Sequence, residues 1–97
     1  MTPPQSELLN AVATIRQSLA SRRTDEVTKA RVGQSLSVIL DESRLVPGGW
    51  YVRDNLGTLR HCVRTIYSAA KSDNTKAKQR ADECLSKIET WVKQSIL

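Results

Sequence analysis

Four basic side chains recur along one stretch of the sequence, at Arg53, Arg60, Arg64 and Lys71. On a helix, with about 100° between residues, they fall within about 40° of one another and extend over about 27 Å. No Asp or Glu stands three or four positions from any of them, so ion pairs within the helix do not neutralise this basic line. Arginine dominates it, and the planar guanidinium suits phosphate oxygens. The basic line therefore predicts contact with the backbone of a nucleic acid, RNA or DNA.

A second and less uniform line of basic residues follows at Lys76, Arg80 and Lys87, with Glu83 beside it. Residues 53 to 80 carry seven basic and two acidic side chains, a balance that equals the +5 net charge of the whole 97-residue chain. We therefore include Lys76, Arg80 and Lys87, the second basic line, in the predicted nucleic-acid-binding surface.

Two other interpretations of the basic line stay open. In one, its arginines are solvated or paired with acids of a neighbouring helix, for which Asp82 and Glu89 are candidates. In the other, the line binds an acidic protein partner. The handedness of the helix packing decides between pairing and exposure, and the sequence does not give it.

The remaining polar residues form no catalytic, cofactor or metal motif. His61 is the single histidine and has no Cys-rich or acidic cluster beside it, which disfavours a metal site. The segment "VPGG" lacks the GK[ST] of a phosphate-binding loop. Neighbouring acids such as Asp41 and Glu42 diverge on a helix, so they form no acid and base pair. We predict a non-enzymatic protein with no cofactor and no metal.

Apolar residues repeat at helical spacing along the chain, and no segment alternates with period two. Outside the second helix, the residues expected on the apolar faces are Leu8, Val12, Ile15, Leu19, Val52, Leu56, Leu59, Val63, Ile66, Ala70, Ala77, Ala81, Cys84, Leu85, Ile88 and Val92. Pro47 and its two following glycines interrupt the pattern, as do the turn residues "SDN". The sequence predicts a single all-α domain over residues 1–97, an antiparallel up-down four-helix bundle with short loops. Its helices are expected at residues 3–21, 24–45, 50–71 and 74–96.

The second of these helices is apolar on two sides. Val32, Leu36, Ile39 and Leu40 share one side, and on nearly the opposite side the sequence has Val27, Val38 and Leu45. A helix with two apolar sides is either central in its fold or covered by another chain. We predict that Val27, Val38 and Leu45 form an interface for other protein subunits or for self-association.

The two cysteines and the aromatic residues support smaller predictions. Cys62 and Cys84 are equally far from the expected turn at Asp73, so we expect them to be neighbours, buried and reduced. Trp50 and Tyr51 are expected to close one end of the core, with stacking on a splayed base as the alternative. Four aromatic residues in the chain are too few for an extended stacking platform.

These features predict a class of function. No apolar run reaches the roughly 18 residues of a membrane span, and the start of the chain does not resemble a secretory signal, so we expect a cytoplasmic protein without membrane contact. The leading hypothesis is a non-catalytic basic helical bundle that contacts nucleic-acid backbone without sequence specificity. Its size, charge and class suggest a small subunit of a larger ribonucleoprotein assembly, by analogy with the small helical subunit of RNA-guided CRISPR surveillance complexes. The alternative is a bundle that binds a protein partner, such as a bacterial immunity protein or an antitoxin-like adaptor.

Overall fold

The computed structural model describes residues 3–21, 25–68 and 75–94, and these ranges contain four helices with turns at their ends and no strands. The all-α prediction is confirmed. The helices are α1 (Pro3–Ala20), α2 (Glu26–Ser43), α3 (Trp50–Ser68) and α4 (Thr75–Gln94).

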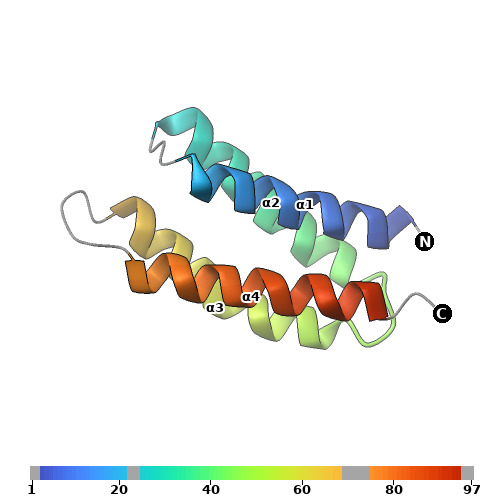
Figure 1. Ribbon diagram of the computed structural model, residues 1–97. Helices are drawn as coiled ribbons and strands as arrows, with labels where there is room; N and C mark the ends of the chain where they lie inside the picture. Colours follow the sequence, from blue (N-terminus) through green and yellow to red (C-terminus); the bar gives the residue numbers. More distant parts are fainter. Residues whose placement is uncertain (1–2, 22–24, 69–74, 95–97) are drawn as a thin grey trace.

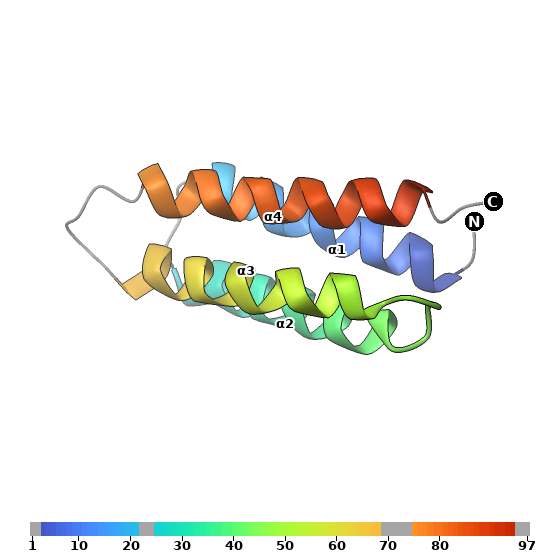
Figure 2. The same cartoon turned by 90° about the horizontal axis from the view of Figure 1, so that it is seen from below.

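The four helices form a bundle around a shared core (Figures 1 and 2). Helix α1 packs against α2 and α4, and α3 packs against the same two helices, whereas the backbones of the diagonal pairs stay farther apart among the described residues. The ring of Tyr51, at the start of α3, lies beside the ring of Trp91 near the end of α4. Arg16, in the second half of α1, contacts Asp82 in the first half of α4.

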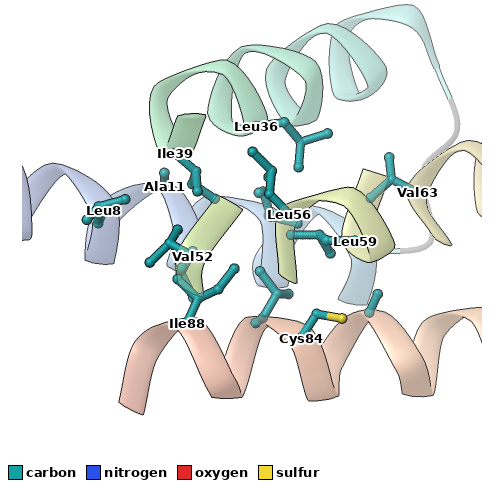
Figure 3. Close-up of a cluster of buried hydrophobic side chains, with 14 of the residues drawn as sticks. Leu8, Ala11, Leu36, Ile39, Val52, Leu56, Leu59, Val63, Cys84 and Ile88 are labelled. Carbon is teal, nitrogen blue, oxygen red and sulfur yellow. The ribbon is translucent and has the colours of Figure 1, made fainter. Parts of the chain in front are cut away.

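The apolar faces expected from the sequence meet between the helices (Figure 3). Burial of each Leu, Ile or Val is worth about 1.5–3 kcal/mol, so this core is the main source of stability. Leu19, Leu40 and Ala77 are half-buried at its edge, and Ala70 lies outside the described residues. The predicted side chains that are buried are Leu8, Val12, Ile15, Val32, Leu36, Ile39, Val52, Leu56, Leu59, Val63, Ile66, Ala81, Cys84, Leu85, Ile88 and Val92.

Helix α2 fills its share of the core partly with small polar side chains. Thr28, Ser35 and Ser43 are buried on the same face as the apolar residues. The Thr28 hydroxyl donates a hydrogen bond to the carboxylate of Asp25, and the Ser43 hydroxyl donates to the carbonyl of Leu40 at 2.7 Å. Such local bonds offset the cost of burying a hydroxyl.

The ends of α2 differ from the predicted ones. The helix begins at Glu26, with Asp25 as its N-cap residue, and Thr24 lies outside the described residues. It ends at Ser43, two residues before the predicted end, because the backbone tightens there: the N–H of Leu45 bonds to the carbonyl of Glu42 at 3.0 Å. Many helices end in this way, with a backbone hydrogen bond to the carbonyl three residues earlier.

The joint between α2 and α3 depends on two glycines. Gly48 has φ +76°, a left-handed conformation that side chains with a Cβ rarely adopt. At Gly49, a Cβ would lie 1.8 Å from the carbonyl oxygen of Ser43. The backbone of the joint therefore folds directly onto the last turn of α2.

We predict that Gly49→Ala lowers the free energy of unfolding by more than about 2 kcal/mol, because the new methyl group collides with backbone. Gly57→Ala is the matched control, since nothing lies within 4 Å of its Cβ position on α3, and it should stabilise the protein by about 0.5–1 kcal/mol. Urea unfolding followed by circular dichroism measures both. Equal stabilities of the two variants would contradict the close approach at Gly49.

Candidate nucleic-acid interface

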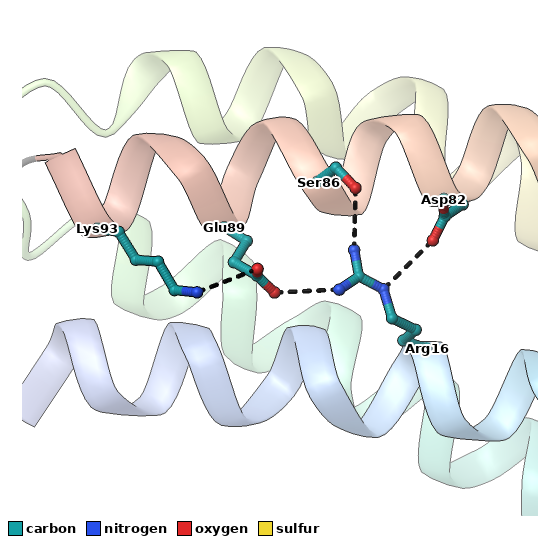
Figure 4. Close-up of polar contacts among 5 residues, drawn as sticks. All are labelled: Arg16, Asp82, Ser86, Glu89 and Lys93. Atoms are coloured by element: carbon teal, nitrogen blue, oxygen red, sulfur yellow. Dashed lines mark hydrogen bonds and ion pairs between the residues drawn. The ribbon is translucent and has the colours of Figure 1, made fainter.

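Arg16 of α1 contacts two acidic side chains of α4, Asp82 and Glu89, on the side of α4 that faces α1 (Figure 4). Its guanidinium Nε lies 3.3 Å from Asp82 Oδ1, and its Nη1 donates a hydrogen bond to Glu89 Oε2 at 3.1 Å. Its Nη2 donates to the hydroxyl of Ser86 at 3.1 Å. Lys93 completes the group by donating to Glu89 Oε1 at 3.2 Å. We call this group the Arg16 clasp.

The clasp also affects the ionisation of Glu89. The hydrogen bond from Lys93 lowers the pKa of the Glu89 carboxyl most, and the charges of Lys93 and Arg16 lower it further, against the opposing effect of burial. Because its pKa is lowered in the folded protein, Glu89 stabilises the fold above the pKa of an unfolded glutamate, and this stabilisation is lost as the pH falls through the lowered value.

The clasp engages the two acids that the sequence suggested as partners of the basic line. Arg60 and Arg64 are exposed on α3, and no ion pair joins either of them to an acid among the described residues. Asp82 and Glu89, the acids that the sequence suggested as partners for α3, are held by Arg16 instead. The interpretation in which these two acids neutralise the basic line is therefore wrong.

Arg53 has a different environment from the rest of the basic line. It is half-buried, and its Nη1 donates a hydrogen bond at 3.1 Å to the carbonyl of Ser43 and a longer one of 3.5 Å to the Ser43 hydroxyl. A cation at the C-terminus of a helix satisfies free carbonyl groups and interacts favourably with the helix dipole. Arg53 therefore fastens α3 to the end of α2.

The second basic line lies along the seam between α3 and α4. Lys76 and Arg80 line a hollow of about 410 Å³ together with His61 and Thr65 of α3. Lys87 lines a second hollow of about 310 Å³ at the other end of the seam. All three cations are exposed and have no ion pair among the described residues. Arg60 and Arg64 line neither hollow, and Lys71 lies outside the described residues.

An aromatic cluster at one end of the bundle was not anticipated. The rings of Tyr51 and Trp91 are 6.4 Å apart at their centroids and inclined by 27°, and Trp50 meets Tyr51 edge-on at 6.1 Å. Trp50 is 60% exposed, so the prediction that it closes the core is wrong. The register that places Cys62 level with Cys84 also brings Tyr51 within about one turn of Trp91, which is the signal that the sequence analysis did not use.

The residues of the predicted protein interface lie in two kinds of environment. Val27 is 65% exposed and Leu45 is 66% exposed. Val38 is half-buried and packs against the core of its own chain. Because Val27 and Leu45 are 18 positions apart, they lie about 27 Å apart if the helical rise continues between them, and they form two separate spots.

Cys62 and Cys84 are both buried and both free thiols, as predicted. Burial raises the pKa of Cys84, the neighbouring Cys62 raises it further, and Lys87 and Arg80 partly oppose the rise. The two thiols therefore interact across α3 and α4, and a raised pKa makes Cys84 a poor nucleophile.

Within residues 3–21, 25–68 and 75–94, no group of three or more His, Cys, Asp or Glu side chains is placed to hold a metal ion. No described helix combines the length and the apolar character needed to cross a bilayer. Comparison of the chain with models of protein families, with curated proteins and with solved structures gives no match.

We predict that Arg53→Ala lowers the free energy of unfolding by about 1–2 kcal/mol, because it removes a charged hydrogen bond from the end of α2. Arg60→Ala and Arg64→Ala should each change it by less than about 0.5 kcal/mol, since both side chains are exposed and unpaired. Thermal and urea unfolding of the three variants provides the comparison. A loss at Arg60 or Arg64 as large as that at Arg53 would show that these arginines have a structural partner.

Proposed function

We propose that this protein is a non-catalytic helical bundle that contacts nucleic-acid backbone through the outer surface of α3 and α4, without reading sequence. The observation that carries the proposal is that Arg60 and Arg64 form no ion pair with a described residue, while the acids that the sequence suggested as their partners are engaged by Arg16. Unpaired arginines gain more from phosphate contacts than arginines that must first give up an ion pair.

The charge of the whole surface supports the same proposal. Arg60, Arg64 and the second basic line contribute five exposed cations, opposed by the exposed acids Asp54 and Glu83. Neither acid forms an ion pair with a described residue. Arg53 borders the surface and keeps donors for a phosphate beyond those bound to Ser43, because a guanidinium has five N–H groups.

The proposal includes an antiparallel up-down order of the four helices, a cytoplasmic location and a role as a small subunit of a ribonucleoprotein assembly. Two contacts support the helix order: Tyr51 with Trp91, and the second half of α1 with the first half of α4.

Two buried free cysteines suit a reducing compartment. Backbone binding without sequence reading suits a subunit whose position is set by its assembly.

We predict that Arg60→Ala combined with Arg64→Ala weakens binding to all sequences alike and flattens the slope of log K against log salt by about 1.4–1.8, because two phosphate contacts no longer release counterions. The matched control is Arg31→Ala with Arg44→Ala, which removes the same charge from exposed positions on α2 and just after it. Fluorescence anisotropy with random-sequence RNA and DNA at several salt concentrations measures both slopes.

Two outcomes would contradict this proposal. One is an α3 variant with wild-type affinity and wild-type salt slope. The other is an equal loss in the α2 control, which would mean that net charge alone, and not the surface of α3 and α4, determines binding.

The second candidate function is binding of a protein partner, and the exposure of Val27 and Leu45 favours it. Large apolar side chains left in water are a common feature of interaction sites when they gather in a patch. Leu45 and Trp50 flank the same joint and are both exposed, so the end of the bundle is the stronger of the two spots.

If that end mediates self-association, light scattering should give a mass above that of one chain for the wild type. Leu45→Glu should return the protein to a monomer, because a charge in an apolar interface is costly, and Val27→Glu at the far end of α2 should not. A wild-type protein that is monomeric at high concentration would remove the self-association form of this candidate.

A further inference from the structure

The two hollows along the seam between α3 and α4 differ in chemistry. The first is lined mainly by polar and charged groups, with the cations Lys76 and Arg80 beside one acid, Glu83. The second is lined by the aromatic side chains of Tyr51 and Trp91 together with Lys87. One end of the seam therefore has a hollow lined by charged side chains, and the other end has a hollow lined by aromatic side chains and Lys87.

The spacing along α4 connects the two hollows. Arg80 and Lys87 are seven residues apart, which is about 10.5 Å along the helix axis, and they share one side of α4. Lys87 and Trp91 are four residues apart and therefore neighbours on that same side. A chain laid along the seam would meet cations first and an aromatic surface at the end.

The aromatic end is only partly buried, although Trp91 packs against the core. Trp50 is 60% exposed, and Tyr51 and Trp91 are half-buried residues that line the second hollow, with their rings inclined by 27° to each other. The hollow, at about 310 Å³, is at the lower end of the range of small-molecule sites, which is about 300–1,000 Å³. Partly exposed aromatic faces next to cations are the combination by which proteins hold unpaired nucleotides.

We propose that the second hollow is a base-stacking subsite for single-stranded nucleic acid, whose phosphates lie along Lys76, Arg80 and Lys87. This inference rests on the proposed function and narrows its substrate from nucleic acid in general to single strands. A base inside a duplex is already stacked and paired, and it would have to be unstacked to reach Trp91. Stacking on a ring tolerates every base, so the subsite adds affinity without sequence specificity.

The test uses the folded full chain carrying Trp50→Phe, which leaves Trp91 as its single tryptophan. The probes are an oligothymidylate of about 12 nucleotides, an abasic deoxyribose-phosphate strand of the same length, a duplex of that length and an oligouridylate. Anisotropy of a label on each probe reports backbone binding, and the fluorescence of Trp91 reports stacking in the same titration.

We expect oligothymidylate or oligouridylate to quench Trp91, and the tighter of the two strands identifies the preferred sugar. The abasic strand should bind about 5- to 160-fold more weakly and leave Trp91 unchanged, because one stacked base is lost. Trp91→Leu should reproduce that loss, and Trp91→Phe should restore most of the affinity. Since the titrations with Trp50→Phe need no change at Trp91, they stand even where Trp91→Leu fails to fold.

The possible failures are distinguishable. Equal binding of the abasic and base-bearing strands, with no change at Trp91, would overturn the stacking subsite and leave the proposed function intact. Equal binding of the duplex with equal quenching would overturn the preference for single strands. Absence of binding to every probe would overturn the proposed function and this inference together.

Discussion

The distribution of charge on this bundle depends on one guanidinium group. Arg16 draws Asp82 and Glu89 to the side of α4 that faces α1, and Lys93 shares Glu89 with it. Exposed ion pairs of this kind stabilise a fold by about 1 kcal/mol or less each, so the larger effect of the clasp is on where negative charge lies. With these acids engaged by Arg16, the arginines Arg60 and Arg64 and the second basic line have no ion pair among the described residues.

A second constraint arises at the joint between α2 and α3. Gly49 allows the backbone to approach the carbonyl of Ser43, and Arg53 binds that same carbonyl from α3. The joint thereby fixes how the start of α3 meets the end of α2. Gly48 lies near the Trp91 ring, since a Cβ added at this position would be 3.4 Å from Trp91 Cζ2. The residues that connect the two helices therefore also help to place the aromatic cluster. The same segment thus contributes both to the packing of α2 with α3 and to the proposed binding surface.

The sequence predicted the features that follow from local periodicity and not those that depend on how helices face one another. The core was predicted because burial selects apolar residues every three to four positions, as Leu8, Val12 and Ile15 illustrate. The end of α2 was placed two residues late, because the tightened turn at Leu45 leaves no apolar signature. The partners of Arg16 were missed because they are more than 60 positions away, and which side of α4 faces α1 depends on packing handedness. The meeting of Tyr51 with Trp91 was accessible from the hairpin register, but the two rings were considered separately.

The central claim is that the arginines of α3 are free for anions while Arg16 is engaged within the fold. Nuclear magnetic resonance of the guanidinium Nε–Hε groups tests it directly, with each signal assigned by an Arg→Lys variant and followed during titration with oligothymidylate. The structure predicts that the signals of Arg60 and Arg64 shift with added strand, whereas that of Arg16 remains in place, because its guanidinium group is already engaged by Asp82 and Glu89. A shift at Arg16 with none at Arg60 or Arg64 would contradict the account.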